Sequence, residues 1–295
     1  MGEVAIVVVT YNSEACIGDL LDSLDGSGAG AIVVVDNGSS DATVQVVEAH
    51  PEVRLVRSTN VGYAGGINRG VREVPDADAY LILNPDLVVR PGLVAPLSAA
   101  LDDPDVGIVV PLVLTSDGRR QDSLRREPTL LRALGLNRTG IPLLSEYVMG
   151  DDAYRGAHDA DWALGAALMF SRACYDAVGG WDESYFLYSE ETEFCLSARD
   201  SGWRTRLVPE AVVIHHEGGS GRSDATHVMQ IVNKVRLYAR RHSRLAGYAY
   251  LAVTVLSELT WVARGHTQSR ASIRGLLRPS TRPPELGCSQ SVLPL

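Results

Sequence analysis

Runs of consecutive aliphatic residues alternate, over the first third of the chain, with stretches whose apolar residues recur every three or four positions. Val4–Val9 and Ala31–Val35 are unbroken apolar runs, which is typical of strands buried on both faces of a parallel sheet. Ser13–Leu24 and Ala42–Ala49 have the spacing of amphipathic helices. The chain therefore begins with two strand–helix units.

The same alternation continues as far as residue 86. Val53–Val56 and Tyr80–Leu83 predict strands, with a helix over Gly65–Glu73 between them. This order predicts an α/β fold with a mostly parallel central sheet and helices on both faces. Ligands of such sheets bind beyond the carboxyl ends of the strands. Four polar or aromatic residues each follow a predicted strand and are expected at that rim: Tyr11, Asp36, Asn60 and Asp86.

Beyond residue 106 the pattern is less regular. Gly107–Leu114, Trp162–Ser171 and Ala211–Ile214 predict further strands, and Glu190–Gly202 predicts a helix. Thr115–Asp161 has no clear period, so loops and short helices over the sheet are expected there.

The end of the chain predicts a helical extension. Residues 227–242 have helical spacing with a basic face, and residues 247–263 are apolar apart from one glutamate. Because 17 residues are few for a membrane span, an interfacial or packed helix is favoured. We accordingly expect an α/β domain over residues 1–226, a basic and apolar helical extension over 227–278, and a disordered Pro-rich tail over 279–295.

Charge and cysteine content narrow the classes of partner and compartment. The net charge is −9, but the residues from His227 onward carry +8, which leaves −17 on the rest. An acidic body excludes nucleic acid as a partner. The basic extension fits anionic lipid, an anionic acceptor or a plain solvated helix surface. The four cysteines are scattered without a C-x-x-C pair, and the sequence has no recognisable signal peptide. Both features predict a cytoplasmic protein. Peripheral contact with the inner face of the membrane stays open. The sequence does not indicate an oligomeric state.

Two motifs near predicted strand ends could contact a nucleotide. Residues 36–41 read Asp-Asn-Gly-Ser-Ser-Asp. The carboxylate of Asp36 can accept a hydrogen bond from the imide N–H of a pyrimidine. Alternatively, the segment forms only a helix cap and a turn. Residues 60–70 are dense in Gly and Asn, and glycine lets a ligand approach the backbone closely. This is not the dinucleotide fingerprint, which should follow the first strand. A nicotinamide oxidoreductase is therefore disfavoured.

Three further motifs offer groups for metal and proton chemistry. Asn84-Pro85-Asp86 could hold Mg²⁺ or Mn²⁺ against a diphosphate, or form only a turn. Glu190-Glu191-Thr192-Glu193 opens a predicted helix. Acidic side chains at a helix N-terminus stabilise the helix through its dipole. Alternatively, the crowding of the carboxylates raises the pKa of one of them and makes it a general base. His215 and His216 follow the last strand and could supply a metal ligand, although a lone histidine is usually structural.

In this order the motifs resemble those of the family 2 glycosyltransferases of the GT-A fold, over roughly residues 4–220. The matching landmarks are 8–12 (Val-Val-Thr-Tyr-Asn), 36–41, 60–70, 84–86, 180–183 (Gly-Trp-Asp-Glu), 190–193 and 216–220 (His-Glu-Gly-Gly-Ser). The sequence is most similar to a bacterial rhamnosyltransferase branch, whose members include an enzyme acting on polyprenyl-diphosphate-linked GlcNAc.

The resemblance implies an inverting, metal-dependent transferase. Its donor would be dTDP-rhamnose, or else a UDP-sugar, and its acceptor a saccharide or lipid-linked saccharide in cell-wall or polysaccharide assembly. Two other classes stay open: a non-catalytic sugar-nucleotide-binding protein, and a nucleotidyltransferase, which would release pyrophosphate instead of a nucleoside diphosphate.

The resemblance also implies roles for individual residues. Asp36 would read the pyrimidine with Tyr11 packed near it. Asp86 would bind the metal, with His216 as the second ligand and His215 as the alternative. The family's base is usually the Asp of a Glu-Asp pair; Glu191 stands in that place here, and the choice between Glu190 and Glu191 is open. The remaining implied donor contacts are Thr10, Asn12, Asn37, Ser39, Asn60, Gly65, Asn68 and Asn84, and the acceptor-side residues are Trp181 and Asp182.

Overall fold

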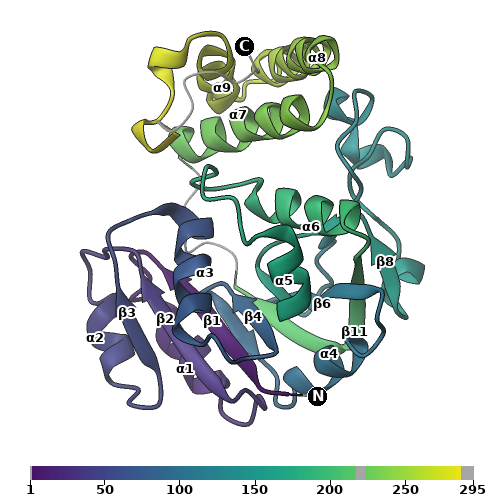
Figure 1. The fold of residues 1–295 in the computed structure, drawn as a ribbon. Helices are drawn as coiled ribbons and strands as arrows, with labels where there is room; N and C mark the ends of the chain where they lie inside the picture. The colour runs from purple at the N-terminus through teal and green to yellow at the C-terminus, as the bar shows by residue number, and fades with distance from the viewer. Residues whose placement is uncertain (1, 217–222, 287–295) are drawn as a thin grey trace.

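A parallel four-stranded unit forms the first part of the fold in the computed structural model, which describes residues 2–216 and 223–286. Strands β1 (Val4–Thr10), β2 (Ala31–Asp36), β3 (Arg54–Arg57) and β4 (Ala79–Leu83) lie in the order β3-β2-β1-β4. Helices α1 (Ile17–Ser23), α2 (Thr43–Glu48) and α3 (Gly62–Glu73) connect them (Figure 1). The predicted strand–helix alternation is therefore confirmed.

The sheet continues beyond β4 with mixed strand directions. Strand β10 (Ala167–Ser171) runs antiparallel between β4 and β6 (Val106–Thr115). Strand β11 (Arg204–His215) is parallel to β6 and antiparallel to β5 (Leu87–Val89). Strand β8 (His158–Ala160) pairs with β11, which completes nine strands. The α/β fold class is confirmed, with parallel order in the first half of the sheet and mixed order in the second.

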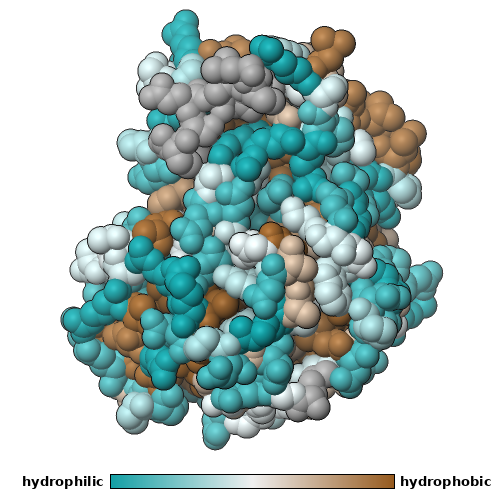
Figure 2. All heavy atoms as spheres, in the orientation of Figure 1, coloured by the Kyte–Doolittle hydropathy of each residue, from teal (hydrophilic) through white to brown (hydrophobic). Residues whose placement is uncertain are grey.

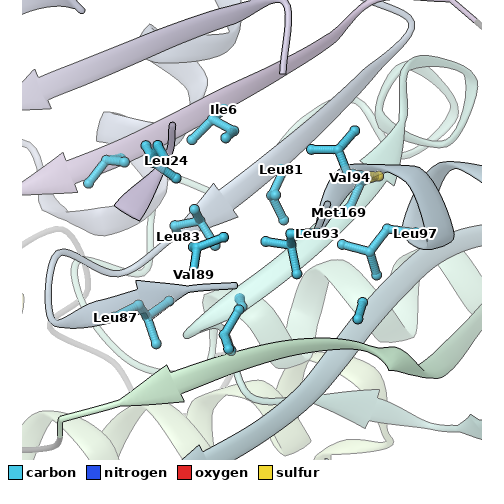
Figure 3. Close-up of a cluster of buried hydrophobic side chains, with 14 of the residues drawn as sticks. Ile6, Leu24, Leu81, Leu83, Leu87, Val89, Leu93, Val94, Leu97 and Met169 are labelled. Carbon is cyan, nitrogen blue, oxygen red and sulfur yellow. The ribbon is translucent and has the colours of Figure 1, made fainter. Parts of the chain in front are cut away.

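Two hydrophobic cores cover the two faces of this sheet. Alternate residues of β1 enter different cores: Ile6 and Val8 face α1 and α4 (Val94–Ala100), whereas Val7 and Val9 face α3 and α6 (Glu190–Asp200). This is the period-two alternation expected of a strand with helices on both sides. Figure 3 shows the first core, where Leu81 and Met169 from neighbouring strands meet Leu97 of α4.

Residues 115–161 form short pieces, as the sequence predicts. They include β7 (Leu124–Arg125) and three 3₁₀ turns, Arg132–Leu134, Asn137–Thr139 and Asp151–Tyr154. The predicted strand over residues 162–171 is interrupted, and its first part, β9 (Trp162–Ala163), pairs with β7 in a separate two-stranded sheet. Helix α5 (Arg172–Val178) follows β10.

Three helices form a further layer above the sheet domain. Helices α7 (Asp224–Arg241), α8 (Arg244–Ala263) and α9 (Thr267–Leu277) pack around a third apolar cluster (Figure 1). Tyr238 of α7 and Tyr250 of α8 stack with ring centroids 4.0 Å apart. Residues 279–286, predicted to be disordered, form two 3₁₀ turns (Pro279–Thr281 and Pro284–Leu286), and the rest of the predicted tail lies outside the described residues.

Candidate functional site

A cavity of about 580 Å³ lies at the carboxyl ends of β1 and β4 and is closed on the other side by α6 and α7. It brings together residues that are far apart in sequence. The following residues predicted to bind or react line it: Thr10, Tyr11, Asn37, Asn60, Asn84, Asp86, Glu190, Glu191 and His215. Strand-end residues and the acidic start of α6 thus share one space.

Asp86 and His215 lie side by side in one corner of this cavity. The pairing of β5 with β11 places them side by side, with His215 Nε2 3.2 Å from Asp86 Oδ1. Nδ1 of His215 lies 3.3 Å from Gln121 Oε1. If Nδ1–H donates to that oxygen, Nε2 keeps its lone pair for a cation. The side chain of His216 is exposed, and its backbone N–H donates to the carbonyl of Asp86 (3.0 Å), so His215 is the better placed of the two histidines.

One carboxylate and one imidazole suit Mg²⁺ or Mn²⁺ that takes its other ligands from a diphosphate and water. Among residues 2–216 and 223–286, no group of three or more His, Cys, Asp or Glu side chains could hold a metal alone. Asn84 is already engaged, because the Tyr63 hydroxyl donates to its Oδ1 (2.7 Å). Burial raises the pKa of Tyr63, so this hydroxyl stays protonated.

Glu190 and Glu191 open α6 and line the same cavity as Asp86. The Glu190 side chain is 3% exposed, and its Oε2 accepts no hydrogen bond from the described protein atoms. Burial, followed by the charge of Glu191, raises the pKa of Glu190 well above its usual value. Burial also raises the pKa of Glu191. Each carboxyl group therefore holds a proton more strongly than a carboxyl group in water, as expected of a group that accepts a proton during a reaction.

A strained turn sets the direction in which this pair points. Tyr188 and Ser189 have φ angles of 68° and 75°, and left-handed backbone in residues other than glycine stores strain and often occurs at functional sites. Asn233 of α7 holds the turn: its Nδ2 donates to the carbonyls of Leu187 (2.9 Å) and Tyr188 (3.2 Å). Gly62 packs against the same loop, since a Cβ there would lie 2.4 Å from the Phe186 carbonyl oxygen.

Asp36 lies behind the cavity wall. Its carboxylate accepts hydrogen bonds from the backbone N–H groups of Gly38 and Ser39 (both 3.1 Å) and from the hydroxyls of Thr10 (3.3 Å) and Ser39. Asp36 therefore orders the turn after β2. In the described structure the Asn37 Oδ1 is buried beside the cavity without a hydrogen-bond donor, and it can accept from a ligand.

The other predicted donor residues lie outside the cavity lining and connect structural elements. Asn12 joins two loops: its N–H donates to Ser39 Oγ (2.9 Å) and its Oδ1 accepts from Ser40 N–H (2.8 Å). Gly65 lies inside α3, where a Cβ would meet Val61 at 2.9 Å.

Asn68, in the second half of α3, holds the loop before α6. Asn68 Nδ2 donates to the Trp181 carbonyl and to Glu183 Oε1 (both 2.9 Å), and its Oδ1 accepts from Trp181 N–H (3.0 Å). Trp181, predicted on the acceptor side, is 3% exposed and stacks on Phe194. Asp182 pairs with Arg240 of α7 (2.8 Å). These polar residues hold the framework, and they do not line the cavity.

Several charged residues of the cavity were not predicted. Arg125, from β7, lies over the Tyr147 ring with 3.8 Å to its centroid. Lys234 of α7 pairs with the buried Glu146 (2.6 Å). Residues 115–161 carry no periodic or motif signal, and the helical spacing around Lys234 predicts a helix but not its place, so only the fold of residues 115–161 and of α7 over the rim brings these side chains to the site.

Comparisons with known proteins agree with this arrangement. Residues 5–151 match the family model described as "Glycosyl transferase family 2". The chain is 30% identical over 302 residues to the N-acetylglucosaminyl-diphospho-decaprenol L-rhamnosyltransferase of Mycobacterium tuberculosis, an alignment that covers 94% of this chain and 95% of the relative. It is 24% identical over 234 residues to the rhamnosyltransferase WbbL of Escherichia coli, covering 75% and 86%.

A solved structure supports the fold. The chain is similar to the mannosyltransferase PcManGT from Pyrobaculum calidifontis in complex with GDP-Man and Mn²⁺, with a TM-score of 0.59 and 18% identity over 99% of this chain and 84% of that one. At this identity the likeness concerns the fold alone, and it confirms the GT-A architecture.

Proposed function

This chain belongs to glycosyl transferase family 2, in a branch with rhamnosyltransferases, and from that premise we propose that it transfers L-rhamnose from dTDP-rhamnose to a saccharide hydroxyl. The proposed acceptor is a polyprenyl-diphosphate-linked GlcNAc, by analogy with the mycobacterial relative, whose name specifies N-acetylglucosaminyl-diphospho-decaprenol. The observation that carries the proposal is that the buried Glu190 and the half-buried Glu191 line the same cavity as Asp86 and His215.

The proposed reaction is a single displacement. Glu191 accepts the proton of the acceptor hydroxyl while that oxygen forms a bond to the anomeric carbon. The bond from the anomeric carbon to the donor's diphosphate oxygen breaks, and its electron pair leaves with the nucleoside diphosphate. One displacement at this carbon inverts its configuration, as it does in inverting glycosidases. The cavity contributes by holding both substrates in line.

Asp86 and His215 would hold Mg²⁺ or Mn²⁺ beside the leaving diphosphate. The bound ion supplies positive charge that offsets the negative charge developing on the leaving group. Two protein ligands are few, which fits an ion that shares its remaining positions with phosphate oxygens and water. The Mn²⁺ in the mannosyltransferase complex supports this use of a divalent ion.

The nucleotide is proposed to lie at the end of the cavity beside β1 and β2. Tyr11 is 55% exposed at the rim and offers a ring to stack on the base. Asn37 Oδ1 offers an acceptor for the pyrimidine imide N–H. Direct contact between Asp36 and the base would require the Ser39 hydroxyl to turn away from the carboxylate, to which it is hydrogen-bonded.

Substitution of the acidic pair tests this function. Glu191→Gln should lower transfer from dTDP-rhamnose by a factor of about 10² to 10⁴, since the amide cannot accept the proton. Calorimetric affinity for the nucleotide should remain. Glu193→Gln is the matched control, because Glu193 lies on the same helix but pairs with Arg241 (3.3 Å) and is absent from the cavity lining of the described residues.

Full activity of Glu191→Gln would remove the proposed role of that residue, and Glu190→Gln then tests the other carboxylate. A thermal-shift panel of dTDP- and UDP-sugars, each with Mn²⁺ and with a chelator, tests the donor. Release of pyrophosphate in place of a nucleoside diphosphate would identify a nucleotidyltransferase and overturn the proposal.

A further inference from the structure

Helix α8 buries three of its polar residues and exposes a row of apolar ones. Thr254, Ser257 and Glu258 are buried, and Glu258 Oε2 lies 3.4 Å from His227 Nε2 on α7. Between residues 245 and 263 no exposed position carries a charge. The exposed face follows helical spacing: Leu245, Tyr248, Ala252, Leu256, Leu259 and Ala263. A surface helix facing water has the opposite arrangement.

The exposed apolar surface continues from α8 onto residues 131–143. Leu131, Leu136, Ile141 and Leu143 are each between 41% and 62% exposed. This segment lies against α8, because a Cβ on Gly135 would come within 2.5 Å of the Ser257 hydroxyl. Figure 2 shows hydrophobic atoms gathered at the upper right, where α8 and this segment lie in Figure 1. We call α8 and residues 131–143 the apolar face.

The apolar face reaches the cavity that holds the acidic pair. Asn137 and Tyr147, within and just after the 131–143 segment, line that cavity. A molecule bound along the apolar face therefore lies next to the cavity rim. A contiguous exposed apolar surface of this kind marks an interaction site.

Exposed arginines lie within the apolar face, at its ends and on the neighbouring α9. They are Arg138 within residues 131–143, Arg244 and Arg264 at the two ends of α8, and Arg270, Arg274 and Arg278 in and just after α9. The single acidic residue between 227 and 278 is Glu258, which is buried. Arg264 also lies over the Trp261 ring, 5.0 Å from its centroid. Arginine and tryptophan beside an apolar face are the groups that settle at the boundary between lipid and water.

We propose that the apolar face docks the protein on the surface of an anionic lipid bilayer, with α8 lying in the plane of the interface. By length and composition α8 is the one described helix that could cross a membrane. However, α7, α9 and the Arg132–Leu134 turn cover its inner side. The helix therefore offers lipid one face only, as an interfacial helix does.

A second copy of this chain is a less suitable occupant. A two-fold contact through the apolar face would bring the surrounding arginines of two copies together, and like charges across an interface disfavour association. Anionic headgroups instead complement these arginines while acyl chains receive the leucines. The docking itself does not depend on the reaction; only the idea that it presents a lipid-linked acceptor to the cavity rests on the proposed function.

Vesicle flotation of the purified full chain tests the docking. The protein should float with mixed phosphatidylcholine–phosphatidylglycerol vesicles, much less with phosphatidylcholine alone, and less at high salt. Leu256→Glu with Leu259→Glu should lower partitioning by a factor of about 100 or more, since each leucine loses its contact with lipid. Arg264→Gln and Arg270→Gln should each lower it by about fivefold.

The matched control is Ala95→Glu with Ala99→Glu. It adds the same charge to exposed positions of α4, which lies at the lower edge of the molecule in Figure 1 while α8 lies at the top. This variant should float like the wild type. Failure of the wild type to float, or equal floating of the α4 and α8 variants, would overturn the docking. So would a dimer in light scattering that the α8 variant turns into monomer.

The two proposals fail in separate ways. Slow hydrolysis of dTDP-rhamnose without vesicles reports the cavity and should be the same in the wild type and the α8 variant. Floating without any turnover would count against the proposed function and support the docking, whereas turnover without floating would do the reverse.

Discussion

The contact between Asn233 and the strained turn before α6 gives a prediction about how the acidic pair is positioned. Leucine at position 233 keeps nearly the same volume but donates no hydrogen bond. The carbonyls of Leu187 and Tyr188 then lose the donor that reaches them from α7. Because Asn233 is fully buried, water does not easily replace it.

The expected loss follows from the two hydrogen bonds. An unsatisfied buried polar group costs about 1 to 3 kcal/mol, and because the two carbonyls are only partly buried, Asn233→Leu should lower the free energy of unfolding towards the lower end of their sum, by about 2 kcal/mol or more. The left-handed conformations of Tyr188 and Ser189 each store about 1 to 3 kcal/mol of strain. We therefore expect the released turn to relax, moving Glu190 and Glu191 away from Asp86. A displacement of about 1 Å lowers a rate by about 100-fold.

Urea denaturation and steady-state kinetics measure the two effects separately. The assay temperature should lie well below the melting point of the variant, so that only folded protein is compared. The fall should be in kcat, with KM for the donor changed little, since the turn leads directly into the acidic pair, whereas Tyr11 and Asn37, proposed to bind the base, follow β1 and β2. Thr260→Ala, which removes a hydrogen bond within α8 (2.8 Å) made by an exposed residue, is the control and should change stability by less than about 0.5 kcal/mol. Unchanged stability and kcat in Asn233→Leu would refute the reasoning.

Three further predictions concern the same cavity. Gly62→Ala should lower the free energy of unfolding by at least about 2 kcal/mol in urea denaturation, because position 62 has φ +80° and the added Cβ would meet a backbone oxygen at 2.4 Å. Asp86→Asn and His215→Ala should each abolish the gain in nucleotide affinity that Mn²⁺ gives in calorimetry; a gain that persists would exclude them as ligands. Burial raises the pKa of both Glu190 and Glu191, so the folded chain binds protons that the unfolded chain has released. The stability that this pair contributes should therefore be complete below the unfolded pKa of about 4.3 and should be lost as the pH rises through the folded pKa. The rate of transfer should change in the opposite direction and fall as the pH drops below that folded pKa. Glu191→Gln should flatten the acidic limb of the rate profile.

The sequence predicted those parts of the site that depend on strand ends. Apolar runs located β1 and β4, and the rule that ligands bind beyond the carboxyl ends of strands then placed Tyr11 and Asp86 at a common rim, where both line the cavity. The acidic start of α6 was also predicted, because three glutamates in four residues at a helix start are a local signal. In each of these cases the information lies within about ten residues of the chain.

The remaining features depend on contacts between distant segments. An apolar run has no direction, so the antiparallel entry of β10 between β4 and β6 could not be predicted. A polar residue in a motif can bind a ligand or can hold two parts of the fold together. Asn68 does the second, because its amide donates to the carbonyl of Trp181, 113 positions away. Lys234 reaches the cavity only because α7 crosses it. No local pattern encodes such pairings.

The position of α7 bears on how the chain is divided into functional units. The sequence suggested a boundary near residue 226, and the family model matches only residues 5–151. Yet α7 supplies part of the cavity wall through Lys234, and Asn233 holds the turn that aims the acidic pair. On its other side α7 packs against α8 through the stacked Tyr238 and Tyr250, so the apolar face is joined to the turn through two packed helices. The helical layer is therefore part of the site itself, and a chain that ended near residue 226 would lack both a wall of the cavity and the hydrogen bonds that hold its acidic pair in place.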